Sequence, residues 1–181
     1  IEVDTTLNFN SPMKRTATDA YTNSSSGNPD TDDYFDNLLF GTTYYWRVRC
    51  RNAIDTSGWS LVWIYNTRDD LSLYTPTNGS TQYTGVTLDW YAHAGVDYYD
   101  VELDTSLTFS SPALKTGTNA YTNSSSSNPD TEKYFEDLFF GKTYYWRVRC
   151  RNANDTSAWT SVWSFTTRDG VTHTSPSDGS S

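Results

Sequence analysis

The sequence predicts an all-β protein built of tandem antiparallel β-sandwiches, and three observations support that prediction. Aromatic residues make up 16% of the chain, and Thr and Val are frequent, whereas the strong helix formers are scarce. Apolar and polar residues alternate in short runs that are separated by Gly, Pro, Asn and Ser. The ten letters YYWRVRCRNA at 44–53 also return 100 positions later, at 144–153.

The 100-residue period defines the expected domains. Residues 1–81 align with residues 101–181 without a gap, and 48 of these 81 positions are identical. A period of this size can bury its own core, unlike the repeats of roughly 20–50 residues that must stack on their neighbours. We therefore expect a module at 1–69 that lacks its first two strands, a complete module at 70–169, and the start of a third module at 170–181.

The complete period contains short expected strands with turn signals between them. It opens with YTPTNGSTQY at 74–83, whose Pro, Gly and Asn are typical of a module entrance and a first turn. Strands are then expected in GVTLDW at 85–90, YYDVELDT at 98–105, DLFFGKTYYWRVRCRN at 137–152 and WTSVWSFTT at 159–167. No segment has an apolar stripe at helical spacing, so we expect an antiparallel sandwich without helices.

Alternation along these segments predicts which side chains enter the core. The expected inward residues of the segments 85–90 and 98–105 are Val86, Leu88, Trp90, Tyr99, Val101 and Leu103. The expected outward residues of the segment 98–105 are acidic: Asp100, Glu102 and Asp104. These carboxylates should therefore line the outer face of the sheet.

The run that leads into the repeated decamer resembles the fibronectin type III family. The matching residues are Leu138, Gly141, Thr143, Tyr144, Val148, Cys150 and Asn152. In that family a Leu six residues before the Tyr forms a tyrosine corner that leads into strand F. Trp90 resembles the buried tryptophan of the family's strand B and Tyr99 the core tyrosine of strand C, and SFTT at 164–167 resembles the closing strand G.

The resemblance covers the complete repeat and, through the period, nearly all of the chain. It implies Greek-key sandwiches in which strand C pairs with strand F. On the family's alternation Tyr44, Trp46, Val48 and Cys50 face inward, and the residues between them face outward. The long polar segment YTNSSSSNPDTEKYF at 121–135 departs from the family, whose members pass more directly into strand E.

Six of the nine arginines lie on the two expected F strands and are the candidate surface contacts: Arg47, Arg49, Arg51, Arg147, Arg149 and Arg151. One hypothesis is a cationic stripe that binds an anionic glycan or a partner protein. The other is a charge ladder with the acidic outer face of strand C, in which each opposed pair stabilises the sheet by up to about 1 kcal/mol. The sequence favours the ladder, because the expected strand neighbour supplies the opposite charges.

Each module also has two tryptophans with the spacing W-x-x-x-W, which are Trp59 with Trp63 and Trp159 with Trp163. The pattern resembles the tryptophan–arginine stack of class I cytokine receptors, which share the fold, but it differs by one residue and implies no receptor function. Trp63 and Trp163 share parity with Tyr65 and Phe165 and are expected in the core. Trp59 and Trp159 are expected over the arginines, in cation–π contacts worth about 0.5–2 kcal/mol. Sugar binding by these rings is the alternative.

No constellation of residues for catalysis is visible. The chain has two histidines, His93 and His173, and no nucleophile–base pair, metal-ligand spacing or phosphate loop. Cys50 and Cys150 occupy the same place in successive repeats and are expected to be buried, inert thiols. The sequence therefore predicts neither an enzyme nor a cofactor.

One acidic segment invites a comparison with calcium loops. NPDTDD at 28–33 offers the oxygen ligands of Asp30, Asp32 and Asp33, but it lacks the regular alternation and the glycine of a known loop. In the second copy Lys133 stands where Asp33 stood, and a lysine opposes a dication. We therefore expect no metal site that the two modules share.

Charge and hydropathy narrow the classes of partner. The net charge of −9 argues against nucleic acid and anionic membrane surfaces as partners, and no apolar run approaches the length of a membrane span.

We predict non-enzymatic structural or adhesive repeat modules of a long secreted or cell-surface protein, similar to bacterial ones and to the repeating units of surface fibres. Expected partners are further copies of the repeat, and surface glycans or proteins. Two alternatives stay open: accessory spacer or carbohydrate-binding modules of a secreted glycan-degrading enzyme, and a ligand-binding module that uses Trp and Arg.

The alignment of the repeats also bears on the ends of the chain. Ile1 aligns with Val101 in the middle of the expected strand C, and two whole periods would need a further piece that corresponds to 82–100. A first module of this kind would expose half of a core. We expect the sequence to be one part of a continuous array of repeats, in which strands upstream in the same polypeptide complete the first module. The second choice is a neighbouring subunit that donates those strands.

Overall fold

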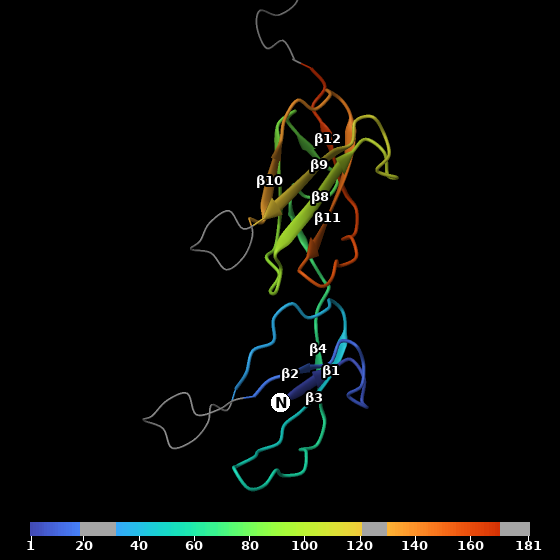
Figure 1. The fold of residues 1–181 in the computed structure, drawn as a ribbon. Helices are drawn as coiled ribbons and strands as arrows, with labels where there is room; N and C mark the ends of the chain where they lie inside the picture. Colours follow the sequence, from blue (N-terminus) through green and yellow to red (C-terminus); the bar gives the residue numbers. More distant parts are fainter. Residues whose placement is uncertain (19–31, 121–129, 171–181) are drawn as a thin grey trace, which may run out of the picture. The chain divides into compact units, whose positions relative to one another are not determined.

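The computed structural model describes residues 1–18, 32–120 and 130–170 (Figure 1). The chain divides into two compact units, unit 1 at Ile1–Asp69 and unit 2 at Asp70–Ser181. Every regular element in the described ranges is a β-strand. No helix of that described part is long and apolar enough to cross a membrane. The expectation of an all-β protein is confirmed.

The described residues of unit 2 form two sheets. The three-stranded sheet has the order β10 (Glu132–Phe135), β7 (Val86–Trp90), β5 (Leu73–Thr75). The five-stranded sheet has the order β6 (Ser80–Gln82), β12 (Trp163–Thr167), β11 (Thr143–Arg151), β8 (Tyr98–Asp104), β9 (Lys115–Ala120). All neighbouring strands are antiparallel except β6 and β12, which pair in parallel.

The connections of unit 2 follow a Greek-key pattern. The chain passes from one sheet to the other at five connections, which are β5 to β6, β6 to β7, β7 to β8, β9 to β10 and β10 to β11. As a result β8 pairs along its whole length with β11, from Tyr98 opposite Arg151 to Asp104 opposite Tyr145. This is the pairing of strand C with strand F that the fibronectin type III resemblance implies. The predicted fold class of an antiparallel β-sandwich is confirmed in unit 2.

The core of unit 2 lies between its two sheets and follows the predicted alternation. On β11 the residues at every second position are fully buried, and they are Tyr144, Trp146, Val148 and Cys150. The opposite sheet contributes Val86, Leu88 and Trp90 from β7, and β8 adds Tyr99, Val101 and Leu103. The rings of Trp90 and Tyr99 meet edge to face with their centroids 5.5 Å apart. Burial of these large apolar side chains is the main term that stabilises the sandwich.

The tyrosine corner is present at the start of β11. The hydroxyl of Tyr144 accepts a hydrogen bond from the backbone N–H of Phe139 at 3.0 Å, and Leu138 is buried beside it. Between them Gly141 has φ +59°, a left-handed conformation that strains most other residues. Unit 1 repeats the corner, since the hydroxyl of Tyr44 accepts from the N–H of Leu39 at 3.0 Å.

Unit 1 forms one four-stranded sheet in its described residues. The order is β2 (Arg15–Thr16), β1 (Glu2–Asp4), β3 (Thr43–Arg47), β4 (Trp63–Asn66), and all pairs are antiparallel. β1 pairs with β3 as β8 pairs with β11, with Glu2 opposite Arg47 and Glu102 opposite Arg147. The sequence repeat therefore gives the same strand pairing in both units.

Three expectations for the core are wrong in unit 1. Cys50 is exposed, Val48 is 36% exposed and Trp63 is 65% exposed, whereas a buried position was expected for each. In unit 2 Val148 and Cys150 are fully buried, whereas Trp163, which was also expected in the core, is half-buried. Unit 2 has a second sheet of β5, β7 and β10, and the described part of unit 1 has no such second sheet. The alternation of strand F was correctly predicted, but burial also requires a layer on the other side. Cys150, which has that layer, is fully buried.

Candidate functional site

The outer face of β11 carries a stack of alternating cationic and aromatic groups. The guanidinium of Arg147 lies 4.4 Å from the ring centre of Trp159, and that of Arg149 lies 4.5 Å from the same ring. Arg147 also lies 4.0 Å from the ring centre of Phe109. We call Phe109, Arg147, Trp159 and Arg149 the arginine–aromatic stack of unit 2. The predicted cation–π contact between Trp159 and the arginines is confirmed.

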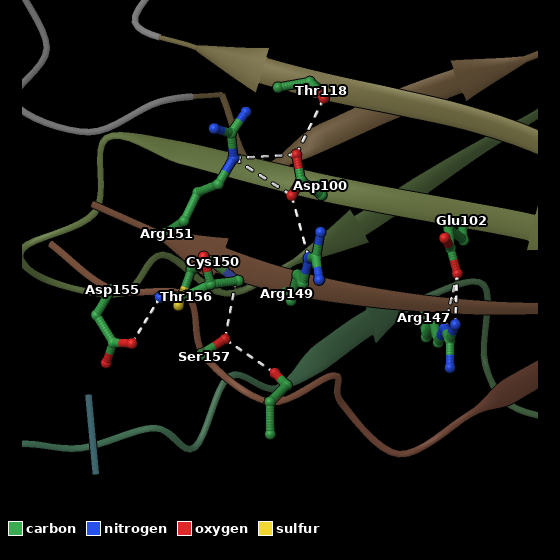
Figure 2. A network of polar contacts seen from close by, with 11 residues as sticks. Asp100, Glu102, Thr118, Arg147, Arg149, Cys150, Arg151, Asp155, Thr156 and Ser157 are labelled. Carbon is green, nitrogen blue, oxygen red and sulfur yellow. Dashed lines mark hydrogen bonds and ion pairs between the residues drawn. The ribbon is translucent and has the colours of Figure 1, made fainter. Parts of the chain in front are cut away.

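The carboxylates of β8 accept hydrogen bonds from the arginines of this stack. Both Nε and Nη2 of Arg147 donate to Oε2 of Glu102, at 2.8 and 2.7 Å (Figure 2). Nε of Arg149 donates to Oδ2 of Asp100 at 3.1 Å. The predicted charge ladder between strands C and F is therefore present for these two pairs.

Asp100 is shared by several donors. Nε of Arg151 lies 3.3 Å from the same carboxylate, and the Thr118 hydroxyl of the neighbouring strand β9 donates to it at 3.0 Å (Figure 2). Arg151 in addition lies 4.5 Å from the ring centre of Tyr98. Each of the three arginines of β11 thus has a carboxylate and an aromatic ring beside it.

A short segment after β11 positions Trp159. The N–H of Ser157 donates to the carbonyl of Cys150 at 2.9 Å, and the Ser157 hydroxyl accepts from the N–H of Cys150 at 3.1 Å (Figure 2). The N–H of Thr160 donates to the carbonyl of Val148 at 2.9 Å. The segment therefore runs along the edge of β11, and Trp159 between Ser157 and Thr160 lies over the arginine row.

The turn after β8 positions Phe109 at the other end of the stack. Phe109 has φ +52° and its N–H donates to the carbonyl of Ser106 at 3.1 Å. A bulky residue rarely adopts this conformation, so packing has to maintain it. Phe109 is buried beneath Arg147. Sequence reasoning missed this residue, although its identity with Phe9 at the matching position was a visible signal.

The placement of Asp104 corrects the prediction of an outer acidic face with three members. Asp104 is fully buried and accepts hydrogen bonds from both the N–H, at 2.9 Å, and the hydroxyl of Ser111. Burial by itself raises the pKa of this carboxyl, but the hydrogen bonds from Ser111, Thr105 and Ser106 outweigh it and lower the pKa below its ordinary value of 3.8. Asp104 therefore fixes the turn that presents Phe109, and it pairs with no arginine of the ladder.

Unit 1 repeats the same arrangement, with Phe9, Arg47, Trp59 and Arg49 as its arginine–aromatic stack. The distances from guanidinium to ring centre are 4.0 Å for Arg47 and Phe9, 4.4 Å for Arg47 and Trp59, and 4.3 Å for Arg49 and Trp59. Nε and Nη2 of Arg47 donate to Oε2 of Glu2 at 2.9 and 2.7 Å. The predicted stacking of Trp59 on the arginines is confirmed as well.

The two units differ around these arginines. In unit 1 Nζ of Lys14 lies 2.6 Å from Oε1 of Glu2, whereas unit 2 has Leu114 at the matching position. Ile1 aligns with Val101, so the described residues of unit 1 include no match for Asp100. Arg51, the third candidate contact of this unit, is exposed and takes part in an isolated backbone bridge to Thr56.

The acidic and histidine residues do not assemble into a metal centre in the described ranges, where no group of three or more His, Cys, Asp or Glu side chains could hold an ion. Asp32 and Asp33 are exposed there. Asp30 of the segment 28–33 and His173 lie outside the described residues, so the structure does not place them.

Comparison with known proteins gave matches only among solved structures. No protein-family profile and no curated protein matches the chain. A crystal structure of chicken CNTN1 FN1–FN3 domains is similar over 73% of this chain and 45% of its own length, with 13% identity and a TM-score of 0.40. A segment of two fibronectin type III domains from chicken tenascin is similar over 70% and 65%, with 14% identity and a TM-score of 0.40. This chain thus spans less than two thirds of the length of either.

A third similar structure is a single fibronectin type III domain derived from the human KIAA0970 protein. It is similar over 62% of this chain and 84% of its own length, with 15% identity and a TM-score of 0.41. The fold assignment of unit 2 rests on its own strand order and tyrosine corner.

Proposed function

We propose that the chain consists of non-enzymatic structural repeat modules of a longer extracellular or cell-surface protein. The modules are 1–69, 70–169 and the beginning of a third at 170–181. The division into compact units at Asp69 and Asp70 supports the first of these boundaries. Further copies of the same repeat, in the same chain or in a fibre, are the expected partners.

The observation that supports a structural role is the internal engagement of the arginine–aromatic stack. Arg147 and Arg149 each contact Trp159 and a carboxylate of β8. A glycan or an acidic partner would have to displace those contacts before it could bind the guanidinium groups. The stack occurs in both units with nearly the same distances. Contacts that stabilise the module are expected in every copy of the repeat, whereas a ligand-binding site is not expected in every copy.

A glycan-binding experiment tests this proposal. The intact 181-residue chain should bind neither anionic nor neutral glycans of a broad panel, and Trp159→Ala should lower its melting temperature. A glycan that binds the native chain, and whose affinity falls in Trp159→Ala but not in Tyr134→Ala, would contradict the structural proposal. That result would support the alternative of carbohydrate-binding modules of a secreted glycan-degrading enzyme. Tyr134 is a suitable control because it is exposed and lies on the other sheet.

A further inference from the structure

Two tyrosine rings of unit 2 contact each other and solvent at the same time. Tyr74 belongs to the edge strand β5, and Tyr91 directly follows β7. Their ring centroids lie 5.2 Å apart, with 53° between the ring planes, which is the separation of aromatic rings in direct contact. Tyr74 is 56% exposed and Tyr91 is 57% exposed. We call these two residues the tyrosine pair.

Strand parity and an irregular register bring the two rings together. Leu73 lies opposite Trp90, and both side chains are buried between the sheets. The residues that follow them in the chain, Tyr74 and Tyr91, therefore point to the outer side of the same sheet. The register of β5 against β7 shifts between Leu73 and Thr75, so Tyr74 is the bulged residue of this strand. A bulge re-aims a side chain, and the contact between the two phenols is thus part of the local fold.

Other exposed tyrosines of unit 2 have neighbours of a different kind. Tyr83 is 65% exposed, and its ring centre lies 4.2 Å from the guanidinium of Arg168. Tyr134 is 57% exposed, and its hydroxyl lies directly over Gly85. A cation covers the first ring, and backbone lies against the hydroxyl of the second. These residues are therefore as accessible as the tyrosine pair, and they serve as comparisons for its chemistry.

We propose that the tyrosine pair is a site of oxidative cross-linking, at which a ring carbon next to the hydroxyl of Tyr74 becomes bonded to the corresponding carbon of Tyr91. The oxidant is hydrogen peroxide acting through a haem peroxidase, which removes one electron from each phenol while each phenol releases one proton. The two phenoxyl radicals join through their ring carbons, and the displaced ring hydrogens return to the phenol oxygens. The pair loses two hydrogen atoms in all, and the peroxide becomes two molecules of water.

The new bond fastens the strand through which the chain enters unit 2. β5 has three residues, lies at the edge of its sheet and is the first strand after Asp70, where this unit begins. A pull along the chain from the preceding repeat therefore reaches β5 before any other strand of unit 2. A covalent link from β5 to the end of β7 closes a loop in the chain and restricts the unfolded state. The inference goes beyond the proposed structural role and concerns the sheet that does not carry the arginine–aromatic stack.

The test treats the intact chain with a haem peroxidase and hydrogen peroxide, at a concentration low enough to suppress coupling between molecules. The monomeric product should show dityrosine fluorescence, and peptide mass spectrometry should find the peptide of Tyr74 joined to that of Tyr91 with two hydrogen atoms lost. Tyr74→Phe and Tyr91→Phe should each abolish this product. Tyr134→Phe, which removes an equally exposed phenol from the same sheet, should leave its yield unchanged.

Thermal unfolding of the coupled chain separates a native contact from a chance collision. Coupling should raise the melting temperature of unit 2, because the unfolded chain loses conformational freedom. Oxidised Tyr74→Phe, which lacks the cross-link, controls for other oxidation. The inference is overturned by absence of the cross-link in the intact chain, by a yield that Tyr74→Phe does not reduce, or by a melting temperature that falls on coupling. Glycan binding plays no part in these measurements, so the inference can fail while the structural role stands, and the converse also holds.

Discussion

Units 1 and 2 have the same strand F sequence and nearly the same arginine–aromatic stack, yet they differ in burial. Cys150 and Val148 are fully buried, whereas Cys50 is exposed and Val48 is 36% exposed. The stack of two arginines with one phenylalanine and one tryptophan is present on the outward side in both units, whereas the carboxylate of Asp100 lies beside it only in unit 2 among the described residues. The inward side is complete only where a second sheet faces it. Strand alternation thus fixes the direction of a side chain, and the opposing layer fixes its burial.

The largest expected effect is the loss of stability caused by a core substitution, which should differ between the two units. Trp146→Ala should destabilise unit 2 by about 3–5 kcal/mol, because a fully buried indole is lost and a cavity remains. Trp46→Ala, its match in unit 1, should cost much less, because Trp46 is only half-buried. Urea unfolding of both variants, followed by hydrogen exchange of each unit, measures the difference. Equal losses in the two units would contradict the difference in burial between Trp46 and Trp146.

Asp104 gives the next largest effect and a dependence on pH. Its folded-state pKa is lowered below the ordinary value of 3.8, so its stabilising contribution is present above that ordinary value and is lost as the pH falls from there through the folded pKa. Asp104→Asn should cost about 1–3 kcal/mol at pH 7, since the hydrogen bonds to a charged carboxylate are lost. It should also make the stability of unit 2 change less with pH in the acid range. Thermal melts between pH 7 and pH 3 measure this, and an unchanged dependence on pH in that range would contradict the assignment.

A smaller effect is expected from the charge ladder. Replacing Arg147 and Arg149 by Thr should lower the stability of unit 2 by about 1–2 kcal/mol, since each loses a carboxylate and a ring contact. The loss should be smaller at high salt, because exposed ion pairs are screened. Arg168→Thr, outside the stack, is the control. A double variant that melts like the wild type but no longer binds a partner would favour the cationic binding stripe.

The smallest effect concerns the ion pair between Lys14 and Glu2 of unit 1, which unit 2 cannot form because Leu114 stands at the matching position. Burial raises the pKa of Glu2, but the hydrogen bonds and charges of Lys14 and Arg47 outweigh it and leave the pKa lowered. Lys14→Leu, which copies Leu114, should raise the pKa of Glu2 toward its ordinary value and cost a few tenths to about 1 kcal/mol. An NMR titration of Glu2 in both variants checks the direction. A pKa that does not move would mean that Arg47 alone governs this carboxyl.

Much of the molecule could be predicted from the sequence because its patterns are local. The alternation in 85–90, 98–105 and 144–150 predicts the core of unit 2, and the Leu138–Tyr144 spacing predicts the tyrosine corner. The stacking of Trp159 on the arginines also follows from the positions of the residues on neighbouring strands. Each of these features needs only strand parity and one known neighbour.

The errors arose where a residue depends on something other than parity. Asp104 has the parity of Glu102 but ends its strand, where the N–H and hydroxyl of Ser111 draw the carboxylate into a turn. Phe109 joins the stack through a turn with positive φ, which alternation does not describe. Cys50 was misplaced because its burial depends on a sheet that the described part of unit 1 lacks.

The most direct test of the account compares the two thiols within one native molecule. Cys50 and Cys150 have the same neighbours in sequence, so their labelling rates differ only through what lies over them. The account predicts that a thiol reagent modifies Cys50 rapidly and Cys150 only as unit 2 unfolds, with peptide mass spectrometry locating each label. Equal rates at the two positions, or rapid labelling of Cys150 in the folded protein, would contradict it.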